Sequence, residues 1–166
     1  MSMTLKDVFE LIQLCIQAKP QVTDCDMRSM ITHLFPRTLK PYTEFTGKVS
    51  EDAIAVIEEM QGNYQGHKVI REHPHKIQTS ITQLIKQMRE TDDWNFDAFE
   101  TQIRKLSVVH ITTTDENTKL RRKGASYESL GIKLIPWVEL NADVRRLIRK
   151  KLLRSDIANR AEWLID

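Results

Sequence analysis

Apolar residues spaced three and four positions apart run through most of this 166-residue chain, and this spacing restricts it to a mainly helical fold. The pattern predicts helices over residues 4–18, 24–34, 51–61, 77–91, 96–105, 115–122, 142–154 and 155–165. Short β-branched runs predict strands at 67–73, 107–113 and 132–135. Two or three short strands among these helices cannot build a doubly wound sheet. The predicted class is therefore α+β, a mostly helical body with a small two- or three-stranded sheet.

The length of the chain and one irregular connection set the expected domain organisation. A chain of 166 residues buries roughly 70% of the surface that it exposes when unfolded, which is enough for one core. Pro36, Pro41 and Gly47 indicate an irregular connection after the second predicted helix. We therefore expect a single domain over residues 1–166, in which any internal boundary separates an N-terminal helical pair, 1–36, from residues 48–166.

Composition excludes several classes of protein. A hydrophobic content of 40% and a charged content of 29% are ordinary for a globular protein, not for a collagenous or disordered one. No stretch reaches 18 apolar residues and the N-terminus lacks a signal-peptide pattern, so we expect a cytoplasmic protein without a membrane partner. Cys15 and Cys25 form no C-x-x-C pair, so neither a disulfide framework nor a zinc knuckle is indicated. The glycine motifs of nucleotide-binding proteins and the G-x-S-x-G motif of hydrolases are absent from the sequence.

The net charge of +2 conceals a strong asymmetry along the chain. Residues 119–154 carry eleven Lys and Arg against three acidic residues, a net of +8, so the rest of the chain carries −6. The predicted helix within this segment has an apolar stripe and a cationic outer face. We expect the following residues to contact nucleic-acid phosphates: Arg145, Arg146, Arg149, Lys150, Arg121 and Arg122. The alternative is a solvated face that balances the acidic residues of the same molecule.

A second functional lead is the segment 71–76, Arg-Glu-His-Pro-His-Lys, where the first predicted strand ends. A carboxylate beside an imidazole at a strand end can bind a metal ion with one group while the other takes a proton from water. Residues 108–117 supply a complementary strand that runs into a helix with polar residues in its first turn.

Together, residues 71–117 resemble the HNH (ββα-metal) endonuclease family, in which an acid-His pair ends a strand and a later helix supplies a metal ligand. The resemblance implies that His73 is the general base and that Asn95 orients it. It implies Glu72 and Asn117 as ligands of Mg²⁺ or Mn²⁺, with Asp115 as a substitute ligand. Two predicted helices separate these residues, and the family's usual Asp is replaced by Glu.

Each of these residues also has an ordinary structural interpretation. Glu72 at an exposed strand end would pair with a neighbouring cation, which is worth about 0–1 kcal/mol. His110, between two β-branched residues, is typical of a sheet position, and Pro74 disturbs the geometry of a His73–His75 zinc pair. The sequence thus supports two main hypotheses. One is a small metal-dependent nuclease or its inactive descendant; the other is a non-catalytic helical module that binds nucleic acid or a protein partner. A purely structural interaction protein is the third alternative.

Overall fold

The computed structural model describes residues 3–63 and 68–164. The chain forms two compact units: unit 1 consists of residues 1–43 and 75–107, and unit 2 of residues 44–74 and 108–166. Each unit is therefore built from two separate stretches of the chain. Within the described residues, none of the helices has the length and apolar character needed to cross a membrane.

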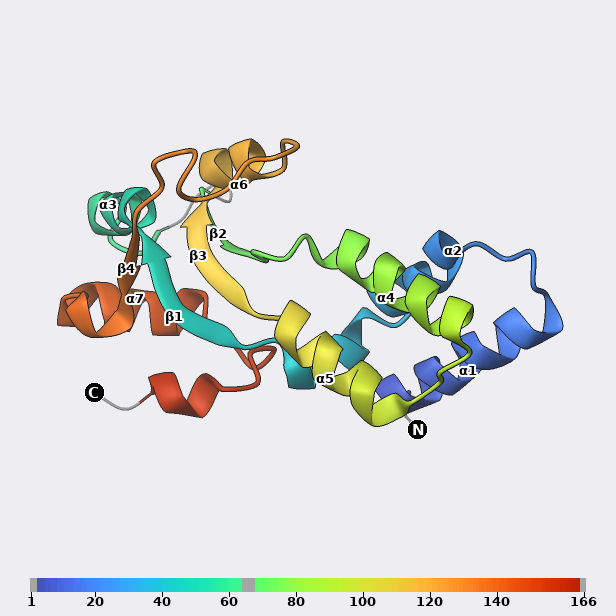
Figure 1. The fold of residues 1–166 in the computed structure, drawn as a ribbon. Helices are drawn as coiled ribbons and strands as arrows, with labels where there is room; N and C mark the ends of the chain where they lie inside the picture. The colour runs from blue at the N-terminus through green and yellow to red at the C-terminus, as the bar shows by residue number, and fades with distance from the viewer. Residues whose placement is uncertain (1–2, 64–67, 165–166) are drawn as a thin grey trace. The chain divides into compact units, whose positions relative to one another are not determined.

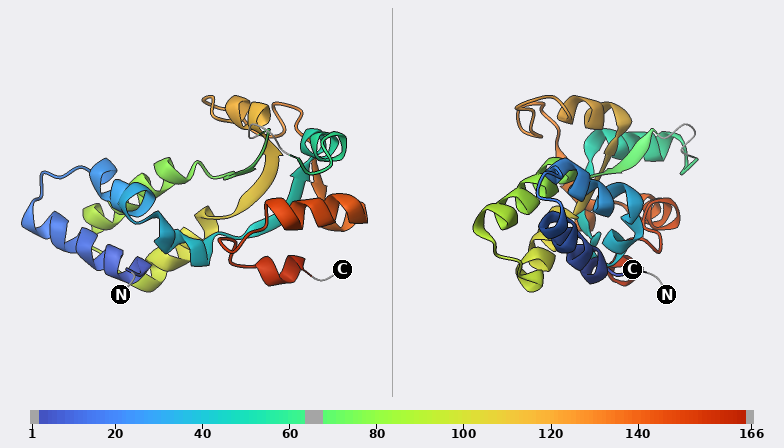
Figure 2. Two further views of the ribbon diagram at one scale, coloured as in Figure 1. Left: turned by 180° about the vertical axis from the view of Figure 1, so that it is seen from behind. Right: turned by 90° about the vertical axis from the view of Figure 1, so that its right-hand side faces the viewer.

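The described residues of unit 1 form helices and the connections between them, without a strand (Figure 2). Its elements are α1 (Leu5–Ala18), α2 (Asp24–Ser29), the π-helix η1 (Met30–Leu34), the 3₁₀-helix η2 (Pro36–Tyr42), α4 (Ile77–Thr91) and α5 (Phe96–Leu106). Thr4 and Thr23 begin α1 and α2 with reciprocal capping boxes. The helical expectations for residues 4–18, 24–34, 77–91 and 96–105 are confirmed, with η1 completing the second predicted helix, whereas η2 occupies part of the connection that was expected to be irregular.

The core of unit 1 comes from the predicted apolar stripes of α1, α4 and α5. Phe9 contacts Trp94, Phe96 and Phe99 with ring centroids 5.0 to 6.1 Å apart. Fully buried apolar side chains such as Ile81 surround these rings, and they recur at helical spacing along their helices. The N-terminal helices thus pack in one unit with the helices of residues 75–107.

Unit 2 contains a four-stranded mixed sheet of order β2-β3-β1-β4 (Figure 1). The strands are β1 (Phe45–Ser50), β2 (Val69–Glu72), β3 (Val109–Thr113) and β4 (Leu134–Pro136). β3 is antiparallel to β2 and parallel to β1, and β4 is antiparallel to β1. The helices of the unit are α3 (Glu51–Glu59), α6 (Thr114–Leu120), η4 (Trp137–Glu139), α7 (Ala142–Lys151) and η5 (Arg160–Trp163).

The core of unit 2 lies between the sheet and the helices α3 and α7. Its strand residues include Val49 and Ile111, and its helix residues include Ile57 and Ile148, all with 0% exposure. Gly47, with φ of +75°, lies against the ring of Trp163. Because a Cβ atom there would come within 2.9 Å of the ring, only glycine fits this position without displacement.

The mostly helical α+β class is confirmed, and the sheet has one strand more than predicted. The additional strand is β1, which lies at the end of the segment expected to be irregular. Gly47 and Lys48 interrupt its apolar pattern, so the β period is not visible there. The helix predicted from residue 155 was wrong: only the 3₁₀ turn η5 forms, and residue 165 lies outside the described residues.

Candidate functional site

The two faces of the sheet in unit 2 carry side chains of different character. Alternate residues of a strand point to opposite faces, so Val109 and Ile111 of β3 contribute to the core while His110 and Thr112 face the other way. The register pairs Glu72 of β2 directly with His110 of β3. Both side chains are buried, with 8% exposure each. This polar face is the first candidate site.

Four side chains of unit 2 interact on the polar face. The Tyr127 hydroxyl donates a hydrogen bond to the Glu72 carboxylate, and the rings of Tyr127 and His110 meet edge to face with centroids 5.3 Å apart. Nδ1 of His110 lies 2.5 Å from Oγ1 of Thr46. Burial, the hydrogen bond to Glu72 and the nearby carboxylates raise the pKa of the Tyr127 phenol far above its usual value. The phenol is therefore a neutral donor at physiological pH.

His73 follows Glu72 and is half-buried. Its Nδ1 lies 3.1 Å from the carbonyl oxygen of Val108, the residue before β3. If Nδ1 donates this bond, the other ring nitrogen carries the lone pair that a general base requires.

The remaining residues of the implied metal set lie on α6. Asp115 is exposed and Asn117 is half-buried. Val69 pairs with Thr113, after which α6 begins, whereas Glu72 pairs with His110 at the opposite end of β2. The backbone of Glu72 is therefore about 10 Å along the strand from the start of α6, at about 3.3 Å per residue.

Asn95 lies in unit 1, where its side chain caps α5 by accepting a hydrogen bond of 3.0 Å from the Ala98 amide. This capping contact is a structural role for a residue that the resemblance placed in catalysis. Across residues 3–63 and 68–164, no three His, Cys, Asp or Glu side chains gather to hold a metal ion. Since the Glu72 carboxylate is engaged by a phenol and Asp115 is in solvent, the implied set of Glu72, Asp115 and Asn117 does not fit a shared Mg²⁺ or Mn²⁺.

Glu116, beside these residues, has a structural function. The residue has 3% exposure, and its carboxylate accepts hydrogen bonds from the Ser50 hydroxyl at 2.6 Å and from the amide and hydroxyl of Thr113 at 2.7 and 3.0 Å. Ser50 and Thr113 are the N-caps of α3 and α6. One buried carboxylate therefore joins the starts of two helices.

The second candidate site is the outer face of α7. The helix buries Val144 and Ile148 in the core of unit 2 and leaves Arg146 and Lys150 exposed. The guanidinium of Arg149 lies 5.6 Å from the ring centroid of Trp137, so this cation is held against the body of the unit. The amphipathic helix with a cationic face that the sequence predicted is confirmed in its geometry.

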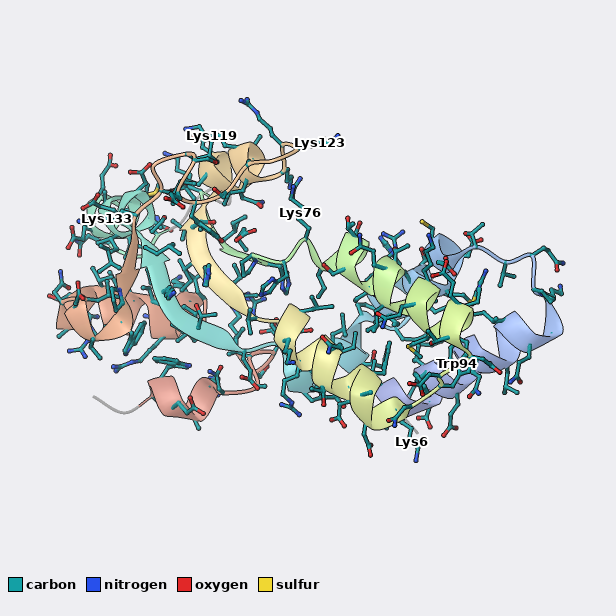
Figure 3. The ribbon with its side chains drawn as sticks, viewed as in Figure 1. Lys6, Lys76, Trp94, Lys119, Lys123 and Lys133 are labelled. Carbon is teal, nitrogen blue, oxygen red and sulfur yellow. The ribbon has the colours of Figure 1, made fainter. Side chains whose placement is uncertain are left out.

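The other predicted phosphate contacts lie elsewhere in unit 2. Arg121 and Arg122 follow α6 and are exposed, and the neighbouring Lys119 and Lys123 project outward from the same place (Figure 3). α6 lies at the end of β3, whereas α7 packs on the core face of the sheet (Figures 1 and 2). The basic segment of the sequence is therefore divided into two separate surfaces.

Two residues, His110 and Tyr127, were not assigned to the polar face from the sequence. His110 lies in β3, as its interpretation as a sheet residue predicted, but its place on the face opposite the core, which follows from alternation with Val109 and Ile111, was not inferred. Tyr127 lies in a connection of 13 residues, from 121 to 133, and only the fold brings it onto Glu72. No sequence signal could have made that assignment.

Comparison with known proteins gives no relative from which a function could be transferred. No family model, no curated protein and no solved structure matches the chain.

Proposed function

We propose that this protein binds nucleic acid through the outer face of α7. The observation that supports the proposal is the division of this helix into a buried apolar stripe and a cationic outer face. Val144, Leu147 and Ile148 are buried in unit 2, and the cationic side chains occupy the remaining surface. A helix anchored by its apolar stripe presents cations in fixed positions, which lowers the entropic cost of each phosphate contact.

The charge on this face exceeds what its neighbours neutralise. Residues 142–151 carry five Lys and Arg and one acid, Asp143, which pairs with Arg146 at 2.9 Å. This pair is exposed, so it is worth less than about 1 kcal/mol and breaks readily for a phosphate. Within residues 3–63 and 68–164, Lys150 and Lys151 have no ion pair. When such Lys and Arg side chains bind a phosphate backbone, they displace the counterions condensed on it, and this release favours association.

The proposal is tested by fluorescence anisotropy with labelled DNA and RNA at several salt concentrations. Arg146→Gln with Lys150→Gln removes two charges from α7, and Lys6→Gln with Lys19→Gln removes two exposed charges from unit 1 as a matched control. We expect the α7 pair to lower the slope of log affinity against log salt by about two, and the control pair to leave it unchanged. Equal effects of the two pairs, or no binding at low salt, would contradict the proposal.

Arg121→Gln with Arg122→Gln asks whether the surface beyond α6 also contributes. If both surfaces contact one nucleic acid, this pair lowers the salt slope as the α7 pair does. If only α7 binds, the slope stays at the wild-type value and the footprint is confined to one side of unit 2.

Phosphodiester hydrolysis is a second candidate function. It is favoured by the order of elements in unit 2, since β2 and β3 are antiparallel and α6 follows directly, as the resemblance to HNH endonucleases implies. His73 would act as the base that activates water. Labelled DNA and RNA, incubated with the protein and divalent cations, should be cut by the wild type and not by His73→Ala, while His75→Ala should retain activity. The absence of any cleavage by pure wild-type protein would leave binding as the function.

A further inference from the structure

We propose that a groove between α4 and α5 of unit 1 binds a short extended peptide segment of a protein partner, and that this segment carries a Lys or Arg residue. The groove has a volume of about 440 Å³ and lies wholly within unit 1. It includes no residue of α7 or of the polar face of the sheet in unit 2. The proposal is therefore independent of nucleic-acid binding and of phosphodiester hydrolysis.

The groove follows a helical hairpin along most of its length. Residues 92–95 join α4 to α5, so the two helices run in opposite directions (Figure 1). The lining of the groove extends along α4 from Ser80 to Thr91, a rise of about 16 Å at about 1.5 Å per residue. An extended peptide covers this length with about five residues at about 3.3 Å each. A helix, with a diameter of about 10–12 Å, would lie mostly outside the groove.

The floor of the groove is apolar and partly open to solvent. Met88 and Phe99 line it as buried residues, with 7% and 2% exposure. Leu84 and Leu106 lie beside them and are only half-buried. Ala98 of α5 is exposed, and its small side chain leaves the groove open. An apolar side chain of a bound peptide would cover the two leucines and remove their exposed surface from water, which favours binding.

Three glutamine amides surround this floor, those of Gln83, Gln87 and Gln102. All three residues are exposed, and their side chains form no hydrogen bond within residues 3–63 and 68–164. A primary amide both donates and accepts hydrogen bonds, so it matches the alternating N–H and C=O groups of an extended peptide backbone. A phosphate would require cations instead, and no lining residue in the described part of the chain is Lys or Arg. The polar groups therefore favour a peptide.

The charge at one end of the groove indicates which peptide would bind. Residues 90–103 contain five Asp and Glu and no Lys or Arg. One of these acids, Asp93, lines the groove just beyond the end of α4 and has no ion pair within the described ranges. The last carbonyl groups of α4 add negative partial charge at the same end. A Lys or Arg side chain of the peptide is complementary to this end.

The experiment is a selection of capped hexapeptides on the immobilised full chain. One library has Lys or Arg at a single position, a second library has Asp or Glu there, and the remaining positions hold Ala, Ser, Leu or Val. We expect enrichment from the first library only, and fluorescence anisotropy then gives the affinity of single enriched peptides. Methylation of their backbone nitrogens should weaken binding by about tenfold, because it removes the N–H groups that the glutamine amides accept.

Variants of unit 1 locate the binding site of the enriched peptides. Ala98→Trp should weaken binding by more than about tenfold, because the indole occupies the groove. Gln87→Ala should weaken it by about fivefold and Asp93→Asn by about threefold, since each removes one exposed polar contact. Glu10→Gln and Gln17→Ala, at exposed positions of α1, are the matched controls and should change nothing. Circular dichroism confirms that each variant is folded.

Three results would overturn the proposal. The first is a selection that enriches neither library, and the second is equal enrichment of the acidic and the basic library. The third is unchanged affinity of folded Ala98→Trp for the enriched peptides, since these would then bind another surface. If Ala98→Trp does not fold, equal affinities of Gln87→Ala, Asp93→Asn and the two control variants lead to the same conclusion.

Discussion

The two faces of the sheet in unit 2 are stabilised by different interactions. On the core face, Val49 and Ile111 pack against α3 and α7 and exclude water. On the polar face, Glu72 and His110 are also buried, although with 8% exposure each, and they form hydrogen bonds to Tyr127 and Thr46. Apolar packing tolerates any side chain of suitable volume, whereas buried polar groups require specific partners. The polar face is therefore stable only while each of these buried groups keeps its partner.

The largest expected difference between the faces comes from two neighbouring residues of β3. Ile111→Ala on the core face should lower the free energy of unfolding by about 2–5 kcal/mol, because it removes buried methyl groups and leaves a cavity. Thr112→Val on the polar face should change it by less than about 1 kcal/mol or raise it, since the buried Thr112 hydroxyl has no partner among the described residues. Urea denaturation measures both. Equal losses would mean that the faces do not differ as described.

The next largest effect is expected at Glu116. Glu116→Ala leaves the Ser50 hydroxyl and the Thr113 amide without their acceptor, which should lower the free energy of unfolding by about 2–3 kcal/mol. Glu128→Ala, at an exposed position of the same unit, is the control and should stay within about 0.5 kcal/mol of the wild type. If Glu116→Ala lowers the free energy of unfolding no more than Glu128→Ala does, the Glu116 carboxylate does not stabilise the fold.

A smaller effect separates steric from backbone contributions at two glycines with φ of +75°. Gly124→Ala should cost about 1 kcal/mol, because its Cβ meets nothing within 4 Å and only the left-handed backbone is disfavoured. Gly47→Ala should cost about 2 kcal/mol, since the Cβ also collides with Trp163 on the core face. Thermal denaturation of both variants gives the difference, and a cost at Gly47 equal to that at Gly124 would show that Trp163 moves freely aside.

The smallest effect is confined to alkaline solution. The pKa of Tyr127 is raised in the folded protein, so above pH 10 the unfolded chain loses this proton while the folded chain keeps it. The contribution of Tyr127 to stability is therefore fully present below pH 10 and declines as the pH rises further. Denaturant midpoints of wild type and Tyr127→Phe should converge or cross above pH 10. A constant difference between pH 8 and pH 11 would contradict the burial of this phenol beside Glu72.

The sequence predicted the helices and strands that local periodicity determines. Spacing of apolar residues located α1, α2, α4, α5 and α7, and β-branched runs located β2, β3 and β4 to within a few residues. It did not predict β1, where Gly47 and Lys48 mask the alternation. It wrongly predicted a helix from residue 155, where the chain instead turns through Asn159 to bond both backbone groups of Phe45. Contacts such as these join residues that are distant in sequence, so no local sequence pattern predicts them.

The candidate sites show the same limit. The cationic face of α7 was predicted because a single helix contains it. The grouping of Glu72 with Asn95 followed from the family resemblance, but Asn95 belongs to the other unit, and Tyr127 donates a hydrogen bond to Glu72. Strand register, which pairs Glu72 with His110, is the information that the sequence lacked.

The strand order has a consequence for the synthesis of the chain. β1 is flanked by β3 and β4, and both are translated after the whole of residues 75–107. At about 5–20 residues per second, β1 leaves the ribosome roughly 3 to 12 seconds before the first residues of β3. During that interval both edges of β1 are unpaired, and its apolar side chains Phe45 and Val49 have no sheet to join. The nascent chain is therefore most vulnerable to aggregation and most dependent on chaperones while the helices that interrupt unit 2 are being made.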